Sequence, residues 1–148
     1  MRLRLELFVD DLDTSIAFYA GIGFAVERRE HDYASLRWGD VVLGLAPIAK
    51  LPISGPGPGF TQERLAGVRG AGVEIVLEVP DLDVAHAAVR AAGHALAEAP
   101  TDRPWGLRDF RLADPDGYYL RITTPPPNQG SDPAAQLNEV SASAETEI

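Results

Sequence analysis

The chain has 148 residues, 45% of them hydrophobic, with a formal net charge of −9 and no cysteine. This length suits one domain or two small packed modules, and the missing cysteines exclude disulfides, a thiol nucleophile and a thiolate metal site. The negative charge argues against nucleic-acid binding, which needs a basic surface to meet phosphates.

The N-terminal sequence shows no export signal. MRLRLELFVDDLD turns acidic before it reaches an apolar stretch of signal-peptide length. No run of about 18 apolar residues occurs in the chain. We therefore expect an unexported, cytoplasmic protein that does not enter a membrane.

The first module is predicted over residues 1–47. An apolar strand at 3–9 precedes Asp11, which is placed to accept hydrogen bonds from the free N–H groups of a helix. Leu12 and Tyr19 fall at helical spacing on that helix. The three strands expected after it lie at about 24–30, 33–38 and 41–46.

A linker rich in glycine and proline is predicted over 48–72. Its GPGPG run lacks the G-x-G-x-x-G pattern and the Walker lysine of a phosphate loop, and proline removes N–H donors. We expect a hinge or lid here, with a short helix around 61–68.

An internal repeat predicts a second module over 73–124. Residues 5–24 match 75–94 at an offset of 70, so that Asp11 falls on Asp81. The sequence Asp-Pro-Asp-Gly at 114–117 predicts a turn between the last two strands. The strands of this module are expected at about 73–79, 94–99, 107–113 and 118–124.

The last segment, 125–148, has no aromatic residue, no lysine and no arginine. Such a sequence buries too little apolar surface to offset the entropy of ordering. It is predicted to be a disordered acidic tail.

Three stretches carry a family resemblance: VDDLDTSIAFYAGIGF, VPDLDVAHAAVRAAG and RPWGLRDFRLADPDGYYLRI. Together they resemble the vicinal oxygen chelate superfamily, which includes glyoxalase I, extradiol dioxygenases and bleomycin resistance proteins. The resemblance covers about residues 3–124. It implies an α+β fold in which two βαβββ modules form curved mixed sheets around a cleft, commonly within a homodimer.

Enzymes of this superfamily hold a divalent metal in the cleft, and the matching ligand positions here are Arg4, Glu74 and Arg121. Arginine has no acceptor and cannot ligate a metal. We therefore expect a charged cluster instead, in which Glu74 pairs with either arginine. A one-residue shift in a strand reverses its face and would bring Glu6, Glu78 or a histidine inward, which keeps a metal-dependent enzyme as the alternative.

The histidines form no helical metal motif. His86 and His94 are expected on the surface of the second helix and just after it, whereas His31 follows the second strand and could line a cleft for binding or proton transfer. Neither a nucleophile with its base nor any other catalytic residue is predicted.

Aromatic side chains are the main candidates for ligand contact, because flat rings stack on planar or cationic molecules. Trp105 lies in a Pro-Trp-Gly string that resembles bleomycin resistance proteins, whose binding groove is metal-free. The aromatic residues expected at the rim of the cleft are Trp105, Trp38, Tyr33, Phe60 and Phe110.

Together these features predict a small-molecule binding protein without a cofactor, which sequesters an aromatic or cationic natural product such as an antibiotic. Arg4, Glu74 and Arg121 would form a polar floor for a carboxylate or phenolate of the ligand. The main alternative is a lyase, isomerase or dioxygenase with a divalent metal. A regulatory or interaction module is the third possibility.

Overall fold

The computed structural model describes residues 3–126, so the predicted tail lies almost wholly outside the described residues. In chain order the elements are β1 (Leu5–Val9), α1 (Leu12–Gly21), β2 (Ala25–Glu30), β3 (Tyr33–Trp38), β4 (Val41–Pro47), the 3₁₀ helix η1 (Ile48–Lys50), β5 (Glu74–Glu78), α2 (Leu82–Ala91), β6 (Glu98–Asp102), β7 (Arg108–Ala113) and β8 (Tyr119–Thr123).

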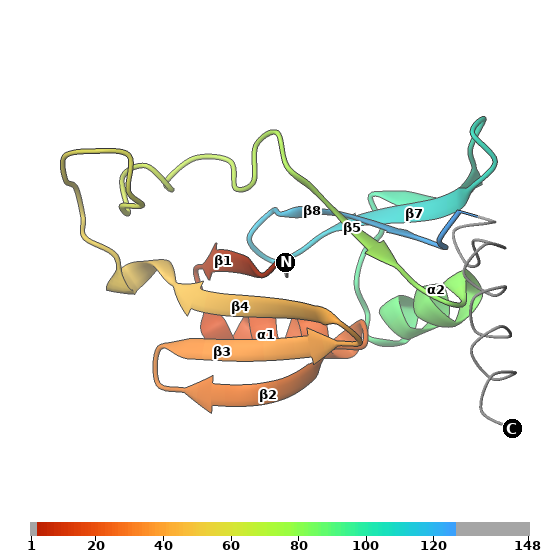
Figure 1. Cartoon of the computed structure of the whole chain (residues 1–148), viewed down its shortest axis with the longest axis horizontal. Coiled ribbons are helices and arrows are strands. Elements are labelled where there is room, and N and C mark those ends of the chain that lie inside the picture. The colour runs from red at the N-terminus through yellow and green to blue at the C-terminus, as the bar shows by residue number, and fades with distance from the viewer. Residues whose placement is uncertain (1–2, 127–148) are drawn as a thin grey trace, which may run out of the picture.

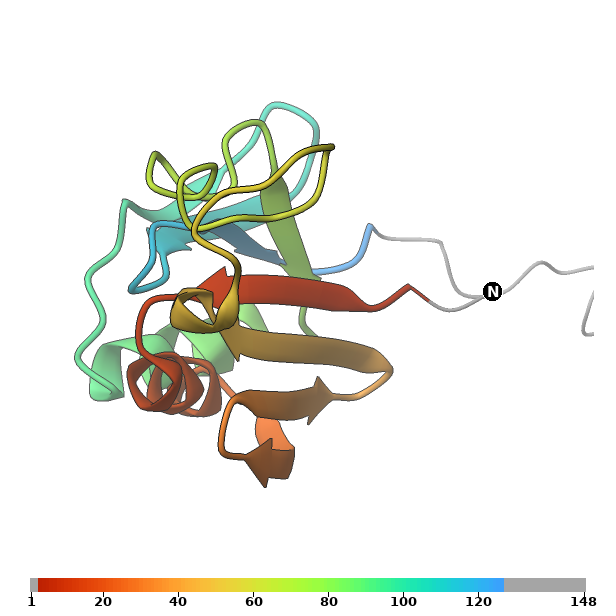
Figure 2. The same cartoon turned by 90° about the vertical axis from the view of Figure 1, so that its left-hand side faces the viewer.

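Each module forms its own four-stranded mixed sheet, in the order β1-β4-β3-β2 and β5-β8-β7-β6 (Figure 1). The pairs β1–β4 and β5–β8 are parallel, and the other neighbours are antiparallel. Figure 2 shows the two helices together on one side of the molecule, with the sheets curving away from them. The predicted α+β fold of two βαβββ modules is confirmed.

Both helices begin as the repeat predicts. The Asp11 carboxylate accepts a hydrogen bond from the Thr14 N–H at 2.7 Å, and that of Asp81 accepts from Asp83 and Val84 at 2.9 and 3.0 Å. Each carboxylate thus satisfies N–H groups that have no partner within the helix.

The core lies between the sheets and the helices, because alternate side chains of each strand point to the helix side. Fully buried large apolar residues stabilise the fold by about 1.5–3 kcal/mol each. They include Tyr19, Ile22, Leu36, Leu45, Val89, Phe110, Leu112, Leu120 and Ile122.

The strand predicted at 94–99 lies later, at Glu98–Asp102. The His94 N–H donates to the Val89 carbonyl at 3.2 Å, so the chain is still engaged with the end of α2 where the strand was expected to begin. Ladder pairing with β7 starts only at Glu98, opposite Arg111.

The helix predicted around 61–68 is wrong, because this part of the linker forms only turns. The Leu65 N–H donates to the Thr61 carbonyl at 3.1 Å, but the turn does not continue into a helix. Instead, the Arg64 guanidinium donates to the carbonyls of Gly59 at 2.6 Å and Gly55 at 2.8 Å, which holds the GPGPG loop closed.

The β7–β8 turn of the second module docks on the first module where β1 runs into α1. Asp116 accepts hydrogen bonds from the Asp10 N–H at 2.6 Å and from the Ser15 hydroxyl at 3.1 Å. The buried Asp114 accepts one from the Tyr19 hydroxyl at 2.8 Å. These two carboxylates therefore link the modules as well as shaping their own turn.

Burial raises the pKa of Asp114, although hydrogen bonds from Tyr19 and from the Tyr118 N–H act in the opposite direction. Burial, reinforced by the charge of Asp114, also raises the pKa of Tyr19. Tyr19 thus stays a neutral donor to Asp114.

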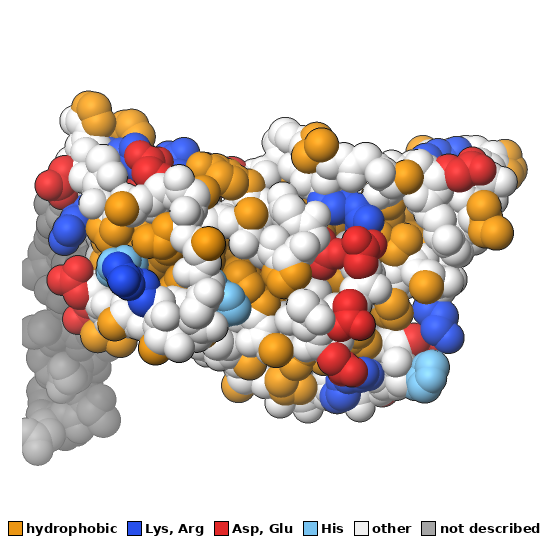
Figure 3. Space-filling view, turned by 180° about the vertical axis from the view of Figure 1, so that it is seen from behind, with side chains coloured by type: hydrophobic (Ala, Val, Ile, Leu, Met, Phe, Trp, Pro, Cys, Tyr) orange, Lys and Arg blue, Asp and Glu red, His pale blue; other side chains and the backbone are white. Residues whose placement is uncertain are grey.

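On the face seen from behind, acidic, basic and hydrophobic side chains are interspersed (Figure 3). No continuous basic surface covers the described residues on this side. Within residues 3–126, no helix is long and apolar enough to cross a membrane.

Candidate functional site

Each sheet has an open face opposite the helices. On the second sheet this face carries charged side chains that contact one another. Along β7 they alternate with Phe110 and Leu112, whose side chains point to the core on the other face. We call this group the ion network; it consists of Glu74, Glu98, Arg103, Asp109, Arg111 and Arg121.

Asp109 lies at the centre of the ion network, and its side chain is 0% exposed. Arg103 Nη2 lies 2.6 Å from Asp109 Oδ1 and 2.7 Å from Glu98 Oε2, and Arg111 Nε lies 3.5 Å from the same Asp109 oxygen. Burial alone would raise the pKa of Asp109, but hydrogen bonds and charge from Arg103, with the charge of Arg111, hold it below the ordinary value. Asp109 is therefore ionised at neutral pH.

Glu74 connects the other side of the ion network. Its carboxylate lies 3.5 Å from Arg121 Nε and 3.6 Å from Arg111 Nη1. Glu74 therefore pairs with an arginine, as predicted. The Arg121 side chain points to the open face of the sheet, because its neighbours Leu120 and Ile122 point to the core.

On the first sheet, the open face holds a separate group around Tyr33. Arg4 Nε lies 2.6 Å from Glu6 Oε1, and the Tyr33 hydroxyl donates to the same oxygen at 3.1 Å. The guanidinium groups of Arg4 and Arg28 lie 5.6 and 5.1 Å from the centre of the Tyr33 ring. A hollow of about 690 Å³ adjoins this group and is lined by Arg4, Glu27, Ser35, Arg37, Asp40 and Val42, among others.

These residues do not fit the metal site that the resemblance implies. Arg4 pairs with Glu6 on one sheet, while Glu74 pairs with Arg121 on the other. No set of three or more His, Cys, Asp or Glu side chains within residues 3–126 is arranged to hold a metal ion. The three implied positions are thus part of two separate groups of ion pairs.

The exposed aromatic residues lie apart. Trp105 is 57% exposed in the loop between β6 and β7, with the Arg103 guanidinium 5.9 Å from the ring centre. Phe60, 59% exposed in the linker, lies with its ring centre 4.7 Å from that of Phe8. His31 is exposed in the turn between β2 and β3.

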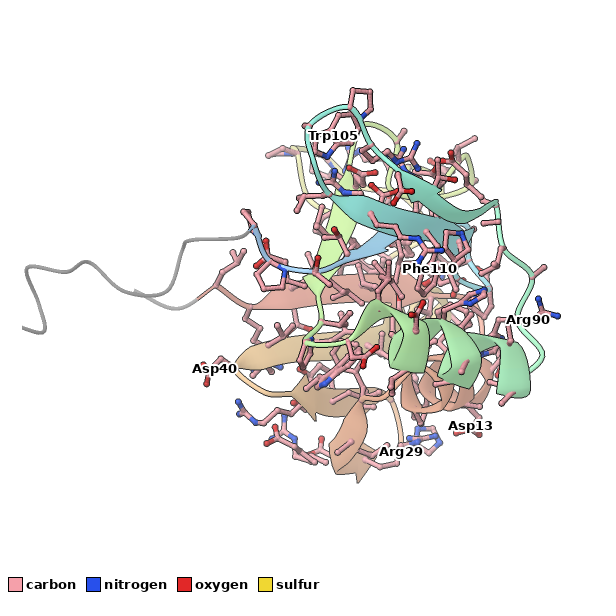
Figure 4. The ribbon with its side chains drawn as sticks, turned by 90° about the vertical axis from the view of Figure 1, so that its right-hand side faces the viewer. Asp13, Arg29, Asp40, Arg90, Trp105 and Phe110 are labelled. Atoms are coloured by element: carbon pink, nitrogen blue, oxygen red, sulfur yellow. The ribbon has the colours of Figure 1, made fainter. Side chains whose placement is uncertain are left out.

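Phe110 is not at a rim, contrary to the expectation. It is fully buried and packs beside His86, with ring centres 5.3 Å apart (Figure 4). The reason is strand alternation, which turns Phe110 toward the helix while its neighbours Asp109 and Arg111 face the open side. As placed, Phe110 supports the site from within the core.

Trp38 also lies on the helix side of its sheet, but it borders a second hollow. This space of about 600 Å³ separates the β3–β4 hairpin from the end of β5, and we call it the junction cavity. Its walls include Phe24, Trp38, Asp40, Val76, Glu78 and Pro80. In Figure 4, Asp40 at the hairpin tip lies far from Trp105, so Trp38 and Trp105 belong to different surfaces.

Four members of the ion network were not predicted from the sequence: Glu98, Arg103, Asp109 and Arg111. The signal for two of them is present in RDFRLA, where charged and apolar residues alternate. With Phe110 and Leu112 assigned to the core, the period of two puts Asp109 and Arg111 on the open face. The contribution of Arg103 depends on loop geometry and has no such periodic signal.

Solved structures share this fold. A bleomycin-binding protein in complex with bleomycin is 22% identical, with 84% of this chain and 98% of that chain covered at a TM-score of 0.61. The bleomycin resistance determinant encoded on transposon Tn5 is 21% identical over 86% of this chain and 100% of that chain, with a TM-score of 0.63. TioX from Micromonospora sp. ML1 is 21% identical over 84% and 98%, with a TM-score of 0.67.

None of the curated protein sequences matches this chain. A family model does match, over residues 3–122, which include both modules and the linker between them. The chain belongs to the glyoxalase/bleomycin resistance protein/dioxygenase superfamily.

Proposed function

We propose that this protein binds an aromatic or cationic small molecule without a metal ion and releases it chemically unchanged. A natural product such as an antibiotic is the class of ligand, and sequestration is the resulting activity. The structures of similar fold include proteins that bind bleomycin or confer resistance to it, which supports this class.

One observation carries the proposal: guanidinium groups occupy two of the three positions that would supply metal ligands. Arg4 and Arg121 offer donors only, and each is already paired with a carboxylate. Such groups recognise a carboxylate, phenolate or amide of a ligand by hydrogen bonding. They do not provide the open coordination positions that metal-dependent chemistry of this superfamily needs.

Three aromatic rings at separate places on the surface are the proposed sites of stacking. Trp105 and Tyr33 each have an arginine beside the ring, and Phe60 is presented by the linker loop that Arg64 closes. Rigid rings lose little entropy when a ligand stacks on them. Affinity would therefore come mainly from ring contacts, with the ion pairs fixing orientation.

Metal-free bleomycin is a suitable first probe. Binding should quench tryptophan fluorescence to saturation, and mass spectrometry should recover the compound with its mass unchanged. Trp105→Ala should weaken binding by about tenfold, the loss of about 1.4 kcal/mol from one stacking contact. Val84→Ala, which truncates an exposed residue on α2, is the matched control and should bind like the wild type.

A product of altered mass would contradict the proposal and favour the enzyme alternative. If metal-free bleomycin does not bind the wild-type protein saturably, the proposed function is also contradicted for this class of ligand.

We further propose that the protein acts as a homodimer in the cytoplasm, since paired clefts are the usual arrangement that the resemblance implies. Light scattering coupled to size-exclusion chromatography should give twice the chain mass of 15.9 kDa. A monomer mass at micromolar concentration would overturn the dimer.

A further inference from the structure

The junction cavity lies where the internal repeat would place a second docking contact. The β7–β8 turn docks on the β1–α1 junction, and its counterpart in the first module, the β3–β4 hairpin, faces the β5–α2 junction (Figure 1). The offset of 70 matches the docking residues Asp10, Ser15 and Tyr19 to Pro80, Ala85 and Val89.

These three substitutions remove the three hydrogen-bond donors that Asp114 and Asp116 use in the first module. Proline has no N–H, alanine has no hydroxyl and valine has no phenol. The hairpin therefore cannot dock as the β7–β8 turn does, and a hollow of about 600 Å³ remains between the modules. That volume is within the range of about 300–1,000 Å³ typical of small-molecule sites.

One wall of the junction cavity is a fixed aromatic ring. Trp38 packs against Phe24 with the ring centres 5.6 Å apart and the planes at 78°. Gly23, at φ +122°, lies close to the indole, since a Cβ there would be 3.3 Å from its ring atoms. The ring is thus held in place before a ligand arrives, which reduces the entropy lost on binding.

The charged groups of the junction cavity are acidic. Asp40 comes from the hairpin and Glu78 from the end of β5, and neither forms an ion pair with another residue in the described part of the chain. Lysine and arginine do not contribute to its walls. Two arginines lie on strands near the cavity, Arg37 on β3 and Arg121 on β8. Both are already paired with glutamates.

From this arrangement we infer that the junction cavity binds a planar organic cation. The ring of the ligand lies against Trp38, and its positive nitrogen lies between Asp40 and Glu78. Attraction of a cation to an indole contributes about 0.5–2 kcal/mol, and the carboxylates add charge attraction. The inference goes beyond the proposed function, because the junction cavity does not include Trp105, Tyr33 or Phe60 and is tested with a probe of its own.

The test uses 9-aminoacridine, a planar cation at neutral pH, as the probe. Anthracene-9-carboxylate has the same three-ring frame and the opposite charge, and serves as the comparator. Calorimetric titration of the full chain should give one site per chain for the cation and at least about tenfold weaker binding of the anion. Equal affinities, or no binding of the cation, would overturn the inference.

Two variants locate the site. Val41→Arg puts a cation into the cavity wall at an exposed position and should weaken 9-aminoacridine binding by at least about tenfold. Val68→Arg makes the same change in the linker, outside the junction cavity, and should leave the affinity unchanged. Equal affinities of the two variants would overturn the inference.

Removal of the carboxylates tests the charge directly. The double variant Asp40→Asn, Glu78→Gln should lose about tenfold in affinity, while Asp32→Asn, Glu63→Gln, with the same change in net charge elsewhere, should lose none. If both doubles bind equally, the inference fails while bleomycin binding still supports the proposed function. If neither probe binds the wild type, both proposals fail.

Discussion

The open faces of the two sheets come from the same repeat but hold their charges in different ways. On the first sheet, Arg4 and Glu6 form a pair whose side chains are 46% and 43% exposed. On the second, the ion network surrounds Asp109, which is 0% exposed. Exposed pairs contribute little stability and rearrange easily, whereas a buried charge is costly without its partners. We therefore expect the second face to be more rigid than the first.

The largest effect should come from Asp109→Asn, which removes the central charge of the ion network and leaves its size unchanged. We expect the free energy of unfolding to fall by about 3 kcal/mol, because Arg103 and Arg111 lose their buried partner. Glu6→Gln is the matched change on the first sheet and should cost less than about 1 kcal/mol. Urea denaturation measures both, and equal losses would remove the difference between the faces.

The same carboxylate predicts a dependence on pH. Because the folded pKa of Asp109 is below its ordinary value of 3.8, its stabilisation is fully present above that value. It is lost as the pH falls through the folded pKa. The stability difference between wild type and Asp109→Asn should therefore be constant from about pH 7 to 5 and shrink below about pH 4. A difference that persists unchanged to lower pH would contradict the assignment.

A smaller effect is expected at the docking turn. Asp116→Ala removes the acceptor for the Asp10 N–H and the Ser15 hydroxyl and should lower stability by about 1–2 kcal/mol. Asp40→Ala, in the corresponding hairpin that does not dock, should change stability by less than about 0.5 kcal/mol. Thermal unfolding compares them, and a larger loss at Asp40 would show that the hairpin makes contacts of its own.

A small effect is also expected from Arg4→Ala. The pair it breaks is exposed, so the loss should be below about 1 kcal/mol and should disappear in 1 M salt, where screening acts over about 3 Å. Equilibrium unfolding at low and high salt checks this. A loss that resists salt would mean that Arg4 is part of a buried network.

The repeat made the fold predictable from sequence. Asp11 and Asp81 mark the starts of both helices, and the 114–117 turn fixes the last hairpin. Local signals were insufficient in the linker, where carbonyl contacts of Arg64 replace the predicted helix. They were also insufficient at His94, whose N–H still donates to the Val89 carbonyl at the end of α2.

The candidate site was predictable only in part. Glu74 and Arg121 lie on the same face of the second sheet because β5 and β8 pair in register. The family resemblance predicted this, since both residues match positions that supply metal ligands in the superfamily. The burial of Phe110 follows from strand alternation and could have been found by counting from Leu112. The junction cavity depends on how two modules meet in space, and only the comparison of the repeats at Pro80 gives it a sequence signal.

We propose above all that this chain binds its ligand without a metal ion. Calorimetric titration of metal-free bleomycin into the full protein, with and without a chelator, tests it most directly. We expect saturable binding of equal affinity in both conditions. Binding that disappears with the chelator and returns with a divalent ion would contradict it.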